Sequence, residues 1–308
     1  VYPLFLGALF ILGSGITLLQ VAANPYVALL GHPDSASARL NFTQAINSLG
    51  AAIGPYIIGK LVLSGIEYSA EEWALLTDQQ KLAFQISEAK SVILPYLGIA
   101  GLLVLLAVLI YFSKLPVIEA AEEEEVNHHI QNDKSQSVWQ YSHLTLGVIG
   151  IFVYVGAEVA IGSFMIKFAK LPHIANLNEL DAKNFVSYYM LGAMVGRFIG
   201  AALLTKINPR VWLGANALAA IALLAFAINS GGMLPLWALV AVGLANSTMF
   251  PTIFTLGIKE LGKLTKAGSS YLIMAIVGGA IIPPLMGLVS DWKNDIQIAF
   301  IVPLICYI

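Results

Sequence analysis

The sequence predicts an all-α polytopic membrane protein, and three observations carry this prediction. First, 58% of the 308 residues are apolar and only 11% are charged, whereas a soluble domain carries about 25% charged residues. Second, the apolar residues gather in nine runs, most of which reach the roughly 20 residues that a bilayer-spanning helix needs. Third, these runs are too long and too continuously apolar for the strands of an outer-membrane barrel.

The composition also excludes whole classes of function. A cytosolic enzyme of this length needs more polar surface than this chain has. A net charge of −2 argues against binding to nucleic acid, whose phosphates attract basic surfaces. Cys306 is the only cysteine in the sequence, so neither an internal disulfide nor a cysteine-based metal cluster is expected.

The predicted spans follow one another along the whole chain. They lie at 3–30, 41–64, 91–113, 144–168, 184–205, 211–230, 233–258, 267–290 and 296–308. The first and the last run are cut by the ends of the sequence. We therefore expect a fragment of a twelve-span protein that lacks the first three spans and most of the last, and that does not transport without them.

Two polar stretches interrupt the early spans. Residues 65–90 mix both charges, and the part from Leu75 to Lys90 fits a short surface helix. Residues 114–143 hold an acidic run and the pair His128–His129, which has no third metal ligand at a useful spacing. We interpret 114–143 as a cytoplasmic loop between two domains, and we expect neither a metal site nor a cofactor.

This loop divides the chain into 1–113 with three spans and 144–308 with six, and an internal repeat links the two parts. A proline and a glycine stand at the same spacing in NPYVALLG from Asn24 and in FPTIFTLG from Phe250. LGAAIGPYIIG from Leu49 and VGGAIIPPLMG from Val277 share a Gly–Pro–Gly spacing. A parallel repeat of six-span halves is the architecture of the major facilitator transporters, whose substrate site lies near the membrane midplane. We predict this fold, with two pseudo-repeated six-helix halves.

Four amide side chains inside the first two spans form two pairs. Gln20 and Asn24 are four residues apart and Gln44 and Asn47 are three apart, so each pair shares a helix face. Amides donate and accept hydrogen bonds, as a neutral polyhydroxyl ligand requires. The alternative is that they hold the helices together, which is worth about 0.6 kcal/mol per bond.

A second polar group lies in the later spans. Glu158 is the one acidic residue deep in a span, and Tyr154 precedes it by one turn. A carboxyl at membrane depth suggests a proton relay or an acceptor for a sugar hydroxyl, or else a structural partner for a tyrosine or an amide. Asn246 and Phe250, four residues apart, offer a hydrogen bond and a stacking face for a sugar ring, or ordinary packing.

Arg197 is the candidate gating residue. It stands beside Gly192, Gly196 and Gly200, whose four-residue spacing predicts a closely packed helix face. The alternative is that Arg197 extends to the cytoplasmic surface.

The sequence contains no phosphate loop, no His/Glu metal motif and no serine elbow. We therefore expect a protein that is not an enzyme and that draws its energy from an ion gradient.

Five strings carry a family resemblance: QVAANPYVALLG from Gln20, RLNFTQAINSLGAAIGP from Arg39, YVGAEVAIGSFM from Tyr154, PTIFTLGIKELG from Pro251 and GSSYLIMAIVGGAIIPPLMGLVSD from Gly268. Together they resemble the fucose–galactose–glucose:proton symporter family of the major facilitator superfamily. The resemblance covers essentially the whole chain. It implies twelve helices, of which this chain holds the fourth to the start of the twelfth. It also implies a multi-pass importer in the bacterial inner membrane that works by alternating access.

The resemblance also suggests roles for single residues. Gln44 and Asn47 match polar sugar-facing positions of the family. Gln20 stands where fucose permeases carry a Glu for proton coupling, and Phe250 stands where they carry a Tyr near that Glu. Both departures favour the glucose/galactose branch and leave Glu158 as the proton-coupling candidate.

The leading prediction is a transporter that carries glucose and/or galactose together with a proton or another cation. We expect it to be a monomer in the lipid bilayer and to bind no nucleic acid. The alternatives are an uncoupled sugar facilitator, a fucose or amino-sugar permease of the same family, and a sugar sensor that does not transport.

Overall fold

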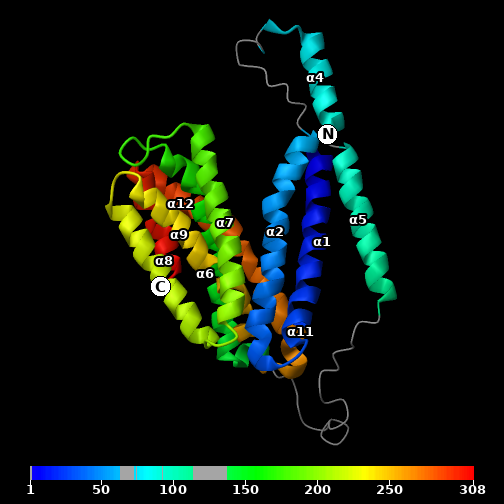
Figure 1. The fold of residues 1–308 in the computed structure, drawn as a ribbon, viewed down its shortest axis with the longest axis vertical. Coiled ribbons are helices and arrows are strands. Elements are labelled where there is room, and N and C mark those ends of the chain that lie inside the picture. The colour runs from blue at the N-terminus through cyan, green and yellow to red at the C-terminus, as the bar shows by residue number, and fades with distance from the viewer. Residues whose placement is uncertain (1, 63–72, 74, 92, 114–136) are drawn as a thin grey trace, which may run out of the picture. The chain divides into compact units, whose positions relative to one another are not determined.

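The computed structural model describes residues 2–62, 73, 75–91, 93–113 and 137–308, and every regular element in these ranges is a helix (Figure 1). The predicted all-α class is confirmed. His128–His129 and the neighbouring acidic run lie outside the described residues.

The described residues of the first part of the chain form four α-helices. α1 (Tyr2–Leu29) and α2 (Ala36–Val62) are joined by a turn that holds the short 3-10 helix η1 (Pro33–Ser35). The helix α4 (Asp78–Ser91), with mostly exposed side chains, confirms the surface helix expected between Leu75 and Lys90, and α5 (Ile93–Phe112) confirms the third predicted span.

The second part contains the six later spans. Its elements are η3 (Val138–Gln140), α6 (Ser142–Ala169), α7 (Glu179–Leu203), α8 (Pro209–Asn229), α9 (Leu234–Asn246), α10 (Met249–Gly257), η4 (Gly262–Leu264), α11 (Thr265–Met274), η5 (Ala275–Val277), α12 (Gly278–Lys293), α13 (Ile296–Ala299) and α14 (Ile301–Cys306). Local sequence explains where several of them begin. Asn178 and Asn208 accept hydrogen bonds from the backbone at the starts of α7 and α8, and Pro209 takes the first position of α8.

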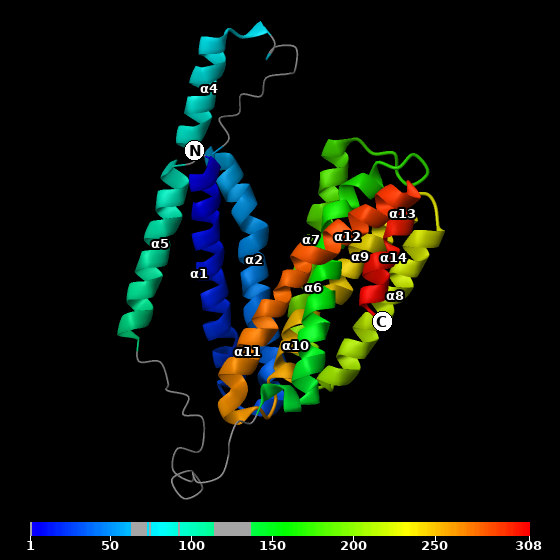
Figure 2. The same cartoon turned by 180° about the vertical axis from the view of Figure 1, so that it is seen from behind.

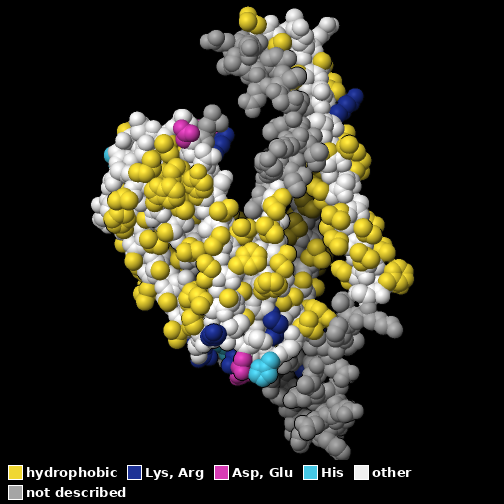
Figure 3. Space-filling view, viewed as in Figure 1, with side chains coloured by type: hydrophobic (Ala, Val, Ile, Leu, Met, Phe, Trp, Pro, Cys, Tyr) yellow, Lys and Arg dark blue, Asp and Glu magenta, His cyan; other side chains and the backbone are white. Residues whose placement is uncertain are grey.

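Seven helical segments among the described residues are long and apolar enough to cross a bilayer: Pro3–Leu29, Ile93–Phe112, Ser142–Ala169, Asp181–Leu203, Pro209–Asn229, Leu234–Gly257 and Gly262–Lys293. Apolar side chains cover the sides of these helices (Figure 3). The 27-residue helix α2 is not among the seven. The chain is a multi-pass membrane protein.

The chain packs as two units, one made of residues 1–48 with 118–308 and the other of residues 49–117. In the larger unit α6 is central and contacts α7, α10, α12 and α14, while α11 packs on α1 (Figure 2). In the smaller unit α4 contacts α5. These units describe packing and do not describe the repeat, so the division of the chain at 114–143 stays a prediction.

Arg39 fixes the turn between α1 and α2. Its guanidinium donates to the carbonyl oxygens of Val27 (3.3 Å), Ala28 (2.7 Å) and His32 (2.8 Å), and it also bonds the hydroxyl of Ser35. A helix leaves its last carbonyls without partners, and a cation interacts favourably with that end. One side chain of α2 therefore caps α1.

Small residues allow close helix contacts in the larger unit. A Cβ added at Gly196 would lie 2.7 Å from the Cβ of Ser247, and one added at Gly200 would collide with Thr248. The predicted glycine face of α7 is confirmed, and it packs on the α9–α10 segment. Gly278 likewise lies directly against the backbone carbonyl of Phe152.

Three predicted spans are interrupted rather than continuous. The span at 233–258 breaks at Ser247–Thr248, between α9 and α10, the span at 267–290 contains the 3-10 segment η5, and the span at 296–308 is divided between α13 and α14. The first break has a cause in the sequence. Pro251 has no N–H, so the carbonyl of Ser247, four residues earlier, has no helical partner.

Candidate functional site

The amides of the first two helices form a hydrogen-bonded chain. Gln44 Nε2 donates to Asn24 Oδ1 at 3.3 Å, and Asn47 Nδ2 donates to Gln44 Oε1 at 3.3 Å. Three of the four predicted amides are thus brought together across α1 and α2. Gln20 lies one turn before Asn24 and is half-buried.

This chain of amides keeps unused hydrogen-bonding groups. Asn24 is only 5% exposed, and its Nδ2 has no partner, although a buried donor without a partner costs about 1–3 kcal/mol. Pro25 follows directly and has no N–H, so the carbonyl of Val21 lacks its usual helical bond. Asn47 is exposed. The unpaired Nδ2 of Asn24 lies beside Gln44, which donates to the Oδ1 of the same amide.

Asn246 is the centre of a buried tyrosine cluster. Its Nδ2 donates to the hydroxyl of Tyr189 at 2.9 Å, its Oδ1 accepts from Tyr307 at 2.8 Å, and its backbone carbonyl accepts from Tyr154 at 3.0 Å. Asn246 and Tyr189 are fully buried, and Tyr154 and Tyr307 are nearly so. The side chain predicted to meet a sugar directly is therefore occupied with holding four helix segments together.

Glu158 lies one turn after Tyr154 on α6 and is partly exposed. Its carboxyl interacts with the hydroxyl of Tyr154 and, at longer range, with the charge of Arg197. None of the ion pairs among the described residues includes Glu158. A carboxyl at this depth without a paired cation is a suitable acceptor for a proton.

Phe250 lies just beyond the break, in the first turn of α10. Its ring is half-buried and stacks on Phe254, with 6.2 Å between the ring centroids. Part of the ring thus remains open to a neighbour.

Arg197 bridges two helices that are far apart in the sequence. Its Nε donates to the carbonyl of Ser247 at 3.0 Å, and its guanidinium also bonds the hydroxyl of Ser48 on α2. The ion pairs of the described ranges do not include Arg197. It is half-buried and directed inward, and its role as a gate stays a prediction.

A polar seam continues this contact along α2, and we define it as Ser37, Asn41 and Ser48 of α2 with Thr252 and Thr255 of α10 and Arg197 of α7. The hydroxyl oxygens of Ser37 and Thr255 are 2.6 Å apart, and Asn41 Nδ2 lies 3.5 Å from Thr252 Oγ1. Asn41 is fully buried, yet its Oδ1 has no partner.

Sequence reasoning missed Tyr189, Tyr307, Ser48 and the carbonyl of Ser247. Tyr189 shares a helix face with Gly192, Gly196 and Arg197, and that polar stripe was the available signal. The sequence contained no comparable signal for Tyr307 or Ser48, which are 61 and 149 residues from their partners.

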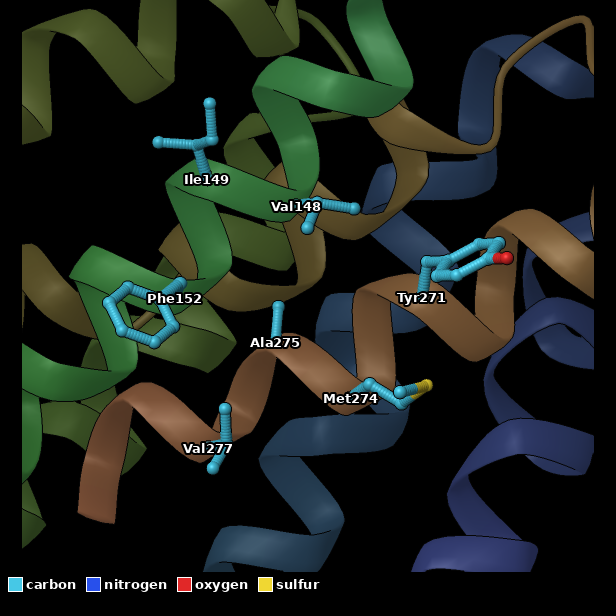
Figure 4. Close-up of a pocket in the computed structure, with 7 residues that line it drawn as sticks. All are labelled: Val148, Ile149, Phe152, Tyr271, Met274, Ala275 and Val277. Atoms are coloured by element: carbon cyan, nitrogen blue, oxygen red, sulfur yellow. The ribbon is translucent and has the colours of Figure 1, made fainter. Parts of the chain in front are cut away.

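An apolar pocket lies between α6 and the α11–η5 segment (Figure 4). Tyr271 supplies the one hydroxyl in its lining, and the other lining side chains are those of Val148, Ile149, Phe152, Met274, Ala275 and Val277. It lacks the amides and carboxyls that bind a polyhydroxyl ligand, so we do not assign the substrate to it.

Comparison with known proteins places this geometry in context. A profile of the Major Facilitator Superfamily matches residues 1–283. The chain is 46% identical over 307 residues to a glucose/galactose transporter of Brucella abortus, covering all of this chain and 70% of that protein. It is 44% identical over 311 residues to a putative glucose/galactose transporter of Helicobacter pylori, covering 99% of this chain and 72% of that protein.

Solved structures agree with the sequence matches. A crystal structure of the fucose:proton symporter FucP of Escherichia coli and one described as the Major Facilitator Superfamily transporter FucP superpose with TM-scores of 0.89 and 0.88 at 34% identity. They cover 99% of this chain, and the chain covers 75% and 74% of them. The second of them is in the outward conformation.

Proposed function

The chain belongs to the major facilitator superfamily, and we propose that it carries a hexose, glucose and/or galactose, together with a proton across the bacterial inner membrane by alternating access. It is a transporter and not an enzyme. The names of its relatives support this substrate class, because one is named a glucose/galactose transporter, another a putative glucose/galactose transporter and a third a fucose:proton symporter.

The observation that carries the proposal is the hydrogen-bonded amide chain of Asn24, Gln44 and Asn47. Its members are linked, so their orientations are set before a ligand arrives, and this lowers the entropy lost on binding. Asn24 keeps a free buried donor. Gln20, one turn away, extends the same face. These four amides bind the hydroxyls of the sugar from one side.

The second group acts from α6 and α10. Tyr154 and Glu158 provide a hydroxyl and a carboxyl, and Phe250 provides a ring face for the apolar side of a hexose. Asn246 holds Tyr154 through its backbone carbonyl, and Tyr189 and Tyr307 engage the two polar atoms of its side chain.

Glu158 binds the transported proton in this proposal. No cation lies within 4 Å of it among the described residues, so its carboxyl gains charge balance by taking up a proton. Another small cation is the alternative co-substrate.

The conformation supports alternating access. The chain resembles an outward structure, and the polar seam closes the end at which α2 begins. We assign that end to the cytoplasmic side, with Arg197 as a gate residue. The protein works as a monomer in the lipid bilayer.

The test is uptake of labelled glucose, galactose and fucose by the full-length protein in transport-deficient cells, with and without a protonophore. We expect glucose or galactose to accumulate and the accumulation to collapse with the protonophore. Equilibration without accumulation identifies the rival function, an uncoupled facilitator, which Gln20 favours because it is not a carboxylate. Failure to take up any hexose overturns the proposal, and accumulation of fucose alone overturns the choice of substrate.

A further inference from the structure

The break between α9 and α10 exposes two consecutive carbonyl groups to other helices. α9 ends at Asn246 and α10 begins at Met249. Pro251 has no N–H and cannot donate to the carbonyl of Ser247. The backbone N–H of Ser247 donates to the carbonyl of Leu244, three residues earlier instead of four, at 3.3 Å. The chain is thereby opened at one peptide group in the middle of a transmembrane segment.

Two side chains from two different helices bind these neighbouring carbonyls. Tyr154 of α6 donates to Asn246 O at 3.0 Å, and Arg197 of α7 donates from Nε to Ser247 O at 3.0 Å. Tyr154 and Arg197 are thus held one peptide group apart. A shift of either side chain changes the partners available to the other.

Each of these two side chains also interacts with a second group, and the two groups lie on different helices. Tyr154 reaches Glu158, one turn along α6. Arg197 reaches the hydroxyl of Ser48 on α2, which is only 7% exposed. A continuous line of contacts therefore runs from the carboxyl of Glu158, through the break, to the polar seam.

The charges along this line are unbalanced. Among the described residues, the charged and titratable side chains that face Glu158 are Tyr154 from its own helix, Arg197 and Tyr189 from α7, and Tyr307 from α14. Arg197 is the one cation in this set. A guanidinium stays charged at every accessible pH, yet the hydrogen-bond partners of Arg197 within the described ranges are a carbonyl and a hydroxyl. An ionised Glu158 attracts it at low dielectric, and a neutral Glu158 does not.

We propose that Arg197 is a positioning residue shared between Ser48 and Glu158, so that it links proton binding at Glu158 to closure of the polar seam. When Glu158 holds the proton, Arg197 stays on Ser48 and the seam is closed. When Glu158 releases that proton to water, its carboxylate competes for the guanidinium, Arg197 leaves Ser48 and the seam loosens. This inference rests on the proposed function, in which Glu158 carries the proton.

The test measures the width of the seam against pH. Spin labels are placed at Asp34→Cys in the α1–α2 turn and Lys263→Cys in η4, in a Cys306→Ser background. Asp34 and Lys263 are exposed. Asp34 lies just before Ser37 at the start of α2, and Lys263 lies just after α10, which holds Thr255. Because opening releases a proton, we expect the label distance to lengthen as pH rises in the otherwise unchanged protein.

Three variants separate coupling from a structural role. Glu158→Gln should keep the distance short at every pH. Arg197→Gln should remove the pH dependence although Glu158 is intact, and Arg197→Lys should restore part of it. The matched control is Arg210→Gln at the exposed start of α8, which should keep the full pH dependence.

Ser48→Ala provides an independent readout that needs no change at Arg197. Without its competitor, Glu158 draws the guanidinium more easily, so the midpoint of the distance change should fall by about one pH unit. A structural role alone would change the distance equally at all pH values. An unchanged midpoint in Ser48→Ala, or a full pH dependence in Arg197→Gln, overturns the inference.

Uptake assays on the same variants show which claim fails. If Glu158→Gln still accumulates sugar in a protonophore-sensitive way, the assignment of the proton to Glu158 is wrong. If Glu158→Gln loses accumulation but Arg197→Gln keeps the pH-dependent distance, the proposed function stands and only the link through Arg197 is wrong.

Discussion

Ser37 and Thr255 lie 218 residues apart in the sequence, and their hydroxyl oxygens are 2.6 Å apart in a buried contact. One turn further along α2, Asn41 meets Thr252 in the same way. Three small hydroxyl side chains and one amide thus join the start of α2 to α10. Each contact is weak, as a contact must be if it breaks and forms again in every transport cycle.

Ser37→Ala should weaken closure of the polar seam. Thr255 keeps its bonds to the carbonyls of Pro251 and Thr252. The closed state therefore loses only the stabilisation from the Ser37–Thr255 hydrogen bond, about 1 kcal/mol. That loss shifts the equilibrium between closed and open states about fivefold toward open. Label distances between positions 34 and 263 measure the shift. Thr205→Ala, which removes a hydroxyl bonded within its own helix end, should leave the populations unchanged.

Gln44→Ala should weaken sugar binding. Gln44 accepts from Asn47 and donates to Asn24, so its loss removes one ligand group and releases two others. We expect the apparent KM for glucose to rise about tenfold or more, while the protein still folds. The matched control is Thr43→Ala on the adjacent, exposed position, whose hydroxyl bonds the carbonyl of Arg39. Equal KM values for both variants would contradict the role of the amide chain.

Glu158→Gln should separate accumulation from exchange. The amide keeps the size of the side chain but cannot take up a proton. Uphill accumulation of sugar should be lost, whereas exchange of labelled for unlabelled sugar should continue. Glu179→Gln provides the control, because Glu179 is an exposed carboxylate paired with Lys170 at 3.8 Å. Normal accumulation by Glu158→Gln would refute the assignment.

Gly278→Ala should destabilise the fold strongly. The added Cβ would collide with the carbonyl oxygen of Phe152, and backbone cannot move aside as a flexible side chain can. Gly214→Ala on α8 meets nothing within 4 Å, and alanine is favoured over glycine in a helix by about 0.5–1 kcal/mol. Thermal unfolding in detergent should therefore show a large fall in Tm for the first variant and an equal or higher Tm for the second.

The sequence predicted what depends on local spacing and on composition. The helical class follows from long apolar runs, and each of the nine predicted spans coincides with one or more helices. The contact between Asn24 and Gln44 could also be expected from the sequence, because α1 and α2 are neighbours joined by a short turn. The glycine face of α7 followed from a four-residue repeat.

Contacts between distant helices were not predictable in this way. The bonds from Asn246 to Tyr189 and Tyr307 depend on how four helix segments are arranged, and no spacing rule relates those positions. The same holds for Arg197 and Ser48. The break at Ser247 did have a local signal in Pro251, but a proline in a membrane helix kinks it in many proteins. Its partners become visible only in three dimensions.

Arg39 gives the α1–α2 pair a mechanical property. Because one guanidinium binds the carbonyls at the end of α1 from a position on α2, a shift of one helix against the other would break several hydrogen bonds at once. We therefore expect α1 and α2 to move together when the polar seam opens. The proposed amide site of Asn24 and Gln44 would then keep its geometry and offer a similar sugar affinity on both sides of the membrane. The direction of net flux is set in any case by the electrochemical gradients of the sugar and the proton.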